Sequence, residues 1–125
     1  MFALSEVLAT GLLVATLLCI AANTVEVAAK AVGARFVLRN CAEVGIGREW
    51  IRYLAVIEAA GVAGLVLGLL GPRLIGLAAA AGLVSYFVAA VATHIRARVF
   101  HNIAYPVAFL CLAVAALWHF ARSAG

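Results

Sequence analysis

One acidic residue of this chain stands where a charge is costly. Glu58 lies within the apolar run "WIRYLAVIEAAGVAGLVLGLLG", residues 50 to 71. An ionised group inside a bilayer costs roughly 2.5–3.5 kcal/mol on insertion scales, so such groups usually face the interior of a helix bundle and a partner. On its own helix, the residues at positions i−4 and i+3 from Glu58 are Leu54 and Gly61, and neither can pair with a carboxylate. We therefore expect the partner of Glu58 to come from another helix.

The first apolar run carries a polar stripe that could supply such groups. Cys19, Asn23, Glu26 and Lys30 follow one another at spacings of four, three and four residues. This spacing places them on one face of a helix. Glu26 and Lys30 also stand in the favourable order for an ion pair between residues i and i+4. The stripe therefore predicts a polar face that runs toward one end of the first helix.

The third apolar run ends with an imidazole, His94, shortly before a basic segment. If the first and third helices run in one direction and the second in the other, then Asn23, Glu26, Glu58 and His94 should reach one depth. A partly buried carboxylate and imidazole can hydrogen-bond a carbonyl and exchange protons. We predict that these four residues form a ligand-binding pocket, and we assign no catalytic residue.

Structural roles are the alternatives for each of these residues. Glu58 and His94 could form an ion pair or hydrogen bond that fixes helix packing. Glu26 could reach the membrane interface beside Lys30, and Asn23 could join two helices by a hydrogen bond. The three cysteines form no C-x-x-C pair, and no phosphate loop, nucleophile elbow or zinc spacing occurs. We expect no metal site, because Glu26, Glu58 and His94 are too scattered to indicate one.

The composition indicates a lipid environment for the whole chain. Of 125 residues, 68% are hydrophobic and only 11% are charged, and the mean hydropathy is +1.20. Soluble domains are nearer half apolar and a quarter charged. The net charge of +4 does not indicate nucleic-acid binding, because the basic residues are spread through the segments between apolar runs, as membrane topology requires.

Four segments are long enough to cross a hydrocarbon core of about 30 Å. They cover roughly residues 3–29, 51–71, 74–94 and 103–121. The Gly71-Pro72 pair leaves only a tight turn between the second and third segments, so these two helices should be antiparallel neighbours. We therefore predict one domain over residues 1–125, an all-α transmembrane four-helix bundle whose surroundings are membrane lipids.

The distribution of lysine and arginine predicts the orientation of this bundle. Seven of the nine basic residues lie in or beside the first and third connections, and only Arg73 and Arg122 lie on the other side. Because cytoplasmic connections collect positive charge, we expect these two connections in the cytoplasm and both termini outside, in a multi-pass protein of the cell (inner) membrane. The first connection, residues 31–49, mixes apolar residues with arginines and should include a short segment along the cytoplasmic surface.

Small residues recur on two of the predicted helices. Ala60, Gly64 and Gly68 stand four residues apart, and "GLAAAAG" occupies residues 76–82. Such faces allow helix backbones to approach closely. We interpret them as packing inside the bundle, with a homodimer interface as the alternative.

The stretch "EWIRYLAVIEAAGVAGLVLGLL", the Gly-Pro turn after it and the later "AVATHIRAR" resemble the small DoxX-like membrane proteins. In that family a tryptophan at the start of the second helix precedes a glutamate, and the third helix ends in a histidine before a basic loop. Glu58 and His94 match these two positions, and the resemblance covers roughly residues 35 to 121. It implies a four-helix bundle. The family's namesake is associated with a thiosulfate:quinone oxidoreductase, and other relatives occur beside redox and oxidative-stress proteins.

From the polar residues and this resemblance we expect a membrane subunit that binds a quinone or similar lipophilic molecule for a redox-enzyme partner, with no covalently bound cofactor. One alternative is a small proton-coupled transporter. Its essential acid would usually lie in the first helix, however, and the charge bias of seven to two argues against dual topology. A structural assembly factor is a further alternative, and an enzyme that uses Glu58 and His94 as acid and base is another.

Overall fold

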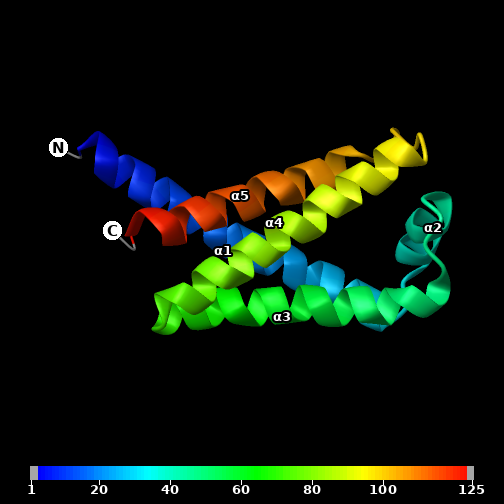
Figure 1. Ribbon diagram of the computed structural model, residues 1–125, viewed down its shortest axis with the longest axis horizontal. Coiled ribbons are helices and arrows are strands. Elements are labelled where there is room, and N and C mark those ends of the chain that lie inside the picture. Colours follow the sequence, from blue (N-terminus) through cyan, green and yellow to red (C-terminus); the bar gives the residue numbers. More distant parts are fainter. Residues whose placement is uncertain (1–2, 124–125) are drawn as a thin grey trace.

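Residues 3–123 are described by a computed structural model of the chain, and they form five α-helices and one short 3-10 turn (Figure 1). The elements are α1 (Leu4–Ala31), α2 (Arg35–Glu43), η1 (Arg48–Trp50), α3 (Ile51–Leu70), α4 (Arg73–Arg96) and α5 (Ala104–Ser123). Helices α1, α3, α4 and α5 are long and apolar enough to cross a membrane. The predicted all-α bundle with four membrane-crossing helices is confirmed.

The four long helices pack in a closed order. Helix α1 packs against α3 and α5, and α4 packs against the same two helices. Both termini and the α3–α4 turn lie at one end of the bundle, whereas α2, η1 and the α4–α5 loop lie at the other (Figure 1). The bundle thus has two distinct ends, and the predicted first and third connections share one of them.

Helices α3 and α4 approach each other closely through small residues. The turn between them is only Gly71-Pro72, as the sequence predicts, because α3 ends at Leu70 and α4 begins at Arg73. A Cβ atom added to Gly68 would collide with the backbone of Gly76 on the facing helix. The small-residue stripe is therefore used for packing inside the bundle.

The core of the bundle is a layer of apolar side chains from all four long helices. Phe120 of α5 fills the space beside Gly76, where any larger residue on α4 would meet its ring. The remaining buried members of this core are Cys19, Leu65, Ala80, Leu83, Phe87, Ala113 and Ala116. Many large apolar side chains outside this core are exposed, as expected where lipid rather than water surrounds the helices.

Helix α2 is the short element expected in the first connection. Gly33 and Gly45 flank it in left-handed conformations, with φ of +66° and +82°, which glycine adopts without a steric penalty. The side chain of Val37 on α2 is buried, and the Glu43 carboxylate lies 2.6 Å from His101 of the α4–α5 loop. Helix α2 is thereby attached to the end of the bundle, and its location along the membrane surface stays a prediction.

Candidate functional site

Glu58 pairs with Lys30, a residue of another helix. The Lys30 ammonium lies 2.7 Å from Oε1 of Glu58, whose side chain is 0% exposed. Helical side chains point back toward the N-terminus of their helix. Lys30, in the last turn of α1, therefore reaches back to the level of Glu58 in α3. The expectation of a partner from a second helix is confirmed, although the partner is not His94.

Glu26 extends this ion pair toward the surface. Its Oε2 lies 3.4 Å from the Lys30 ammonium, and it confirms the pair predicted between residues i and i+4. The exposed fraction of the side chains rises from 0% at Glu58 to 10% at Lys30 and 30% at Glu26. The three residues, which we call the charged triad, form a path from the interior of the bundle to its periphery.

Asn23 lies next on the same face of α1, and it is fully buried. Its Nδ2 donates to the Cys19 carbonyl oxygen at 2.8 Å and approaches the Cys19 Sγ at 3.5 Å. Within residues 3–123 its Oδ1 has no hydrogen-bond partner. The polar stripe of α1 thus faces the bundle interior, as its spacing predicts, and it keeps one unused buried acceptor.

Tyr86 of α4 is a further member of the site. Gly61 faces Leu83 across the α3–α4 contact, so in this antiparallel register Tyr86, three residues after Leu83, stands opposite Glu58. The Tyr86 hydroxyl interacts with the Glu58 carboxylate. By ordinary distance and angle criteria, however, Oε2 of Glu58 has no hydrogen-bond partner in the described part of the chain. The carboxylate therefore has one oxygen, Oε1, held by Lys30 and a second, Oε2, without a hydrogen-bond partner among residues 3–123.

His94 is placed away from this cluster. It follows Tyr86 by eight residues, which at 1.5 Å per residue puts it about 12 Å farther along α4. Its Nδ1 lies 2.9 Å from the Ala90 carbonyl oxygen of its own helix, and no hydrogen bond or ion pair joins it to Glu58 across residues 3–123. The structure does not place His94 at the depth of Glu58, because Glu58 lies seven residues inside α3 whereas His94 lies two residues from the end of α4. Its role in ligand binding stays a prediction.

An apolar groove of about 380 Å³ lies between α3 and α4 and reaches Tyr86. We call it the α3–α4 groove, and its walls include Ile57, Gly61 and Gly64 of α3 and Ile75, Ala78 and Tyr86 of α4. In the antiparallel register, Ile57 and Tyr86 stand at the same end of these walls. The groove therefore ends at the tyrosine that contacts Glu58.

Helix α2 contributes a thiol near the outer part of the triad. Burial raises the pKa of the Cys41 thiol above its usual value of 9.0, and the charge of Lys30 opposes that rise while the charge of Glu26 adds to it. The charges of Lys30 and Glu26 therefore both influence the pKa of the Cys41 thiol. Among residues 3–123, no group of three or more histidine, cysteine or acidic side chains could hold a metal ion.

One member of the site, Tyr86, is not indicated by the sequence. Lys30 lies on the polar stripe that predicts partners for Glu58, although it is not among the four predicted ligand-binding residues. Tyr86 carried no signal, because its position opposite Glu58 depends on how α3 and α4 pack. Asn23 and Glu58, by contrast, are buried inside the bundle and Glu26 is partly exposed, and their role in ligand binding stays a prediction.

Comparison with known proteins supports the family resemblance. The model of the DoxX-like family matches residues 14–116, more than four-fifths of the chain. This range includes the charged triad, Asn23, Tyr86 and His94. Neither a search of curated proteins nor one of solved structures found a match. Four helices able to cross a membrane and this family match make the chain a multi-pass membrane protein. It belongs to the DoxX-like family.

Proposed function

We propose that this protein binds a quinone or a similar lipophilic molecule from the bilayer, as the membrane subunit of a redox system. The observation that carries the proposal is the end of the α3–α4 groove at Tyr86, whose hydroxyl interacts with the buried carboxylate of Glu58. An apolar surface for a ring thus adjoins a polar group that can orient a carbonyl.

The size and lining of the groove suit such a ligand. Binding pockets for small molecules usually have volumes of about 300–1,000 Å³ and are mostly apolar with a few polar groups. The α3–α4 groove lies at the small end of this range, at about 380 Å³. Its glycine and alanine walls can accept a flat ring. Tyr86 has one O–H, which interacts with Glu58 in this structure, and it would donate to a ring carbonyl on turning toward the groove.

The charged triad gives the site a route for protons. A bound quinone supplies two-electron chemistry that also takes up two protons, and a redox-enzyme partner would supply the electrons. Glu58, Lys30 and Glu26 are in contact with one another, and their exposure rises from the first to the last. Carboxylates and amines in hydrogen-bonded contact can pass a proton between them.

The distribution of arginines between the two ends of the bundle supports one orientation in the membrane. Arg35, Arg39, Arg48, Arg96 and Arg98 all lie at the end that carries α2. We propose that this end faces the cytoplasm and that both termini face the opposite side. Protons would then reach the triad from the cytoplasm through Glu26.

The test is photolabelling with a photoreactive short-chain ubiquinone analogue in lipid nanodiscs, with the labelled peptides mapped by mass spectrometry. An Ala78→Phe variant fills the groove without changing the triad. Ala81→Phe is the matched control, because Ala81 is exposed on the same helix but does not line the groove. We expect label on α3 and α4 near Tyr86 in the wild type and in Ala81→Phe, and a loss of most of it in Ala78→Phe.

A Tyr86→Phe variant separates the polar contact from the apolar surface. Loss of one hydrogen bond of about 0.5–1.5 kcal/mol should weaken labelling by several-fold at subsaturating analogue. Equal labelling of the wild type and Ala78→Phe, or label spread evenly over the lipid-facing residues, would remove the proposal.

A structural role for the triad is the second candidate. It is favoured by the Lys30–Glu58 contact itself, which joins α1 to α3 and is almost fully sequestered. If Glu58→Gln lowers the melting temperature while quinone labelling and every cellular activity stay intact, the triad serves to hold the helices together. Reduced labelling at unchanged melting temperature supports the binding role instead.

A further inference from the structure

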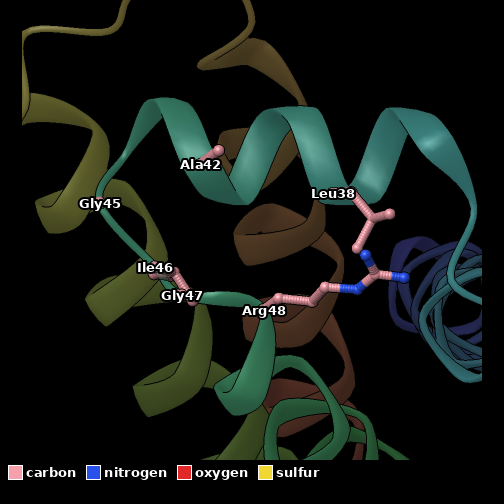
Figure 2. Close-up of a pocket in the computed structure, with 6 residues that line it drawn as sticks. All are labelled: Leu38, Ala42, Gly45, Ile46, Gly47 and Arg48. Atoms are coloured by element: carbon pink, nitrogen blue, oxygen red, sulfur yellow. The ribbon is translucent and has the colours of Figure 1, made fainter.

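A second groove lies at the α2 end of the bundle, well separated from the α3–α4 groove. It has a volume of about 430 Å³ and is lined by Leu38 and Ala42 of α2, by residues 45–47 of the following loop, and by Arg48 (Figure 2). Apolar side chains form one wall and a guanidinium the other. We call it the α2 groove.

Positive charge surrounds this groove. Figure 2 shows the Arg48 side chain extended beneath α2, with its guanidinium close to Leu38. Arg35 and Arg39 share a helical face with Leu38 and Ala42, because these positions are three or four residues apart. Among the described residues, none of the three arginines forms an ion pair with a carboxylate.

Negative charge is confined to the far end of the groove. The side chain of Glu49 folds back against Gly47, which Figure 2 places at the other end from the Arg48 guanidinium. Glu43, the other carboxylate of this region, contacts His101 at 2.6 Å and does not line the groove. An anion in the groove is therefore favoured beside Leu38 and the arginines, and disfavoured beside Gly47.

Aromatic residues indicate the depth of the groove in the membrane. Phe36 precedes the groove in sequence, Trp50 and Tyr53 follow it, and all three side chains are about half exposed. Trp50 and Tyr53 also contact each other. Exposed tryptophan and tyrosine gather at the level of lipid headgroups, so we expect the groove to open where phosphate and glycerol groups of lipids are concentrated.

We infer that the α2 groove binds an anionic phospholipid of the surrounding membrane. The lipid phosphate pairs with Arg48, flanked by Arg35 and Arg39, and the glycerol and the start of an acyl chain lie against Leu38 and Ala42. Guanidinium groups bind phosphate oxygens through two parallel hydrogen bonds. The apolar wall beside the charge favours a lipid over free phosphate, an acidic peptide or a nucleic acid. This inference does not depend on quinone binding.

Native mass spectrometry of the full protein, released from micelles that contain phosphatidylglycerol and phosphatidylcholine, tests the inference. We expect the wild type to retain phosphatidylglycerol in preference to phosphatidylcholine. Arg48→Gln should weaken this retention roughly tenfold or more, because a charge-assisted hydrogen bond contributes about 1.5–3 kcal/mol. The matched control is Arg122→Gln, which removes an exposed arginine at the opposite end of the bundle and should leave retention unchanged.

Two further arms distinguish this groove from diffuse charge attraction and from a phosphate site. Ala42→Phe keeps every arginine but fills the groove, so we expect it to lose lipid retention as well. Soluble glycerol 3-phosphate lacks acyl chains and should not displace the lipid. The inference is overturned if the two lipids are retained equally, if Arg48→Gln and Arg122→Gln behave alike, if Ala42→Phe binds like the wild type, or if glycerol 3-phosphate displaces the lipid.

Discussion

Replacing Lys30 with methionine should destabilise the bundle much more than replacing Glu26 with glutamine. Methionine keeps most of the length of the lysine side chain but removes its charge. The Glu58 carboxylate, which is 0% exposed, then has no opposite charge beside it. Glu26→Gln leaves the Lys30–Glu58 contact in place and removes only the outer member of the triad.

The geometry gives the size of the effect. At the observed N···O distance of 2.7 Å, two unit charges attract by about 6 kcal/mol at an effective dielectric constant of 20. The cost of removing both charges from water offsets much of this attraction, so the intact pair adds little net stability. Removing one partner leaves the desolvation cost of the other, and losses of about 3–5 kcal/mol are typical. The Glu26–Lys30 pair is longer, at 3.4 Å, and partly exposed, and pairs of this kind contribute about 0.3–0.5 kcal/mol.

The assay is reversible unfolding in mixed dodecylmaltoside and dodecylsulfate micelles, followed by circular dichroism. A double variant, Lys30→Met with Glu58→Gln, completes a double-mutant cycle. Because it leaves no unpaired buried charge, we expect it to be more stable than Lys30→Met alone by about 2 kcal/mol or more. The reasoning is refuted if Lys30→Met and Glu26→Gln cost the same, or if the losses of Lys30→Met and Glu58→Gln simply add.

Three further predictions concern the packing, the unused acceptor and α2. Gly68→Ala should lower the free energy of unfolding by about 1–3 kcal/mol, because its Cβ would collide with Gly76. Gly82→Ala is the control and should cost nothing, because its Cβ would meet nothing within 4 Å. Equal losses for the two variants in the same unfolding assay would contradict the close α3–α4 contact. Asn23→Leu should be neutral or stabilising by up to about 1 kcal/mol, because it removes a buried oxygen without a partner; a loss above about 2 kcal/mol would show that Asn23 is fully satisfied. Burial raises the pKa of the Cys41 thiol above 9.0, so its thiolate fraction is small at pH 7. The rate of maleimide labelling of Cys41, mapped by mass spectrometry, should therefore still rise between pH 8 and pH 9. A rate that levels off below pH 8 would contradict the burial of this thiol.

The long elements of the fold could be predicted because each depends on a local property of the sequence. An uninterrupted apolar run sets the length of a membrane helix, and Gly71-Pro72 leaves no room for anything but a turn. The Glu26–Lys30 pair was predictable for the same reason, since helical spacing alone brings the two residues together.

The members of the site from different helices could be predicted only in part. The sequence placed Glu58 and His94 in the same third of the membrane, but Glu58 lies seven residues from the end of its helix and His94 only two residues from the end of α4. Lys30 reaches Glu58 because its flexible side chain points back along α1, and Tyr86 does so because of the register of α3 against α4. Both depend on packing between helices, which periodicity within one helix does not encode.

Solid-state NMR in lipid bilayers tests the central claim, that Lys30 and Glu58 form a buried pair beside a groove for a lipophilic ligand. The sample is a Glu26→Gln variant with ¹⁵N-labelled lysine and ¹³C-labelled glutamate carboxyl groups, so that Glu58 is the one carboxylate in contact with Lys30 among the described residues. We predict a dipolar coupling between the Lys30 ammonium and a carboxyl carbon that corresponds to the 2.7 Å N···O contact. We also predict that adding short-chain ubiquinone shifts this carboxyl resonance. An absent coupling would contradict the pair, and a carboxyl resonance that ubiquinone leaves unshifted would contradict the ligand site.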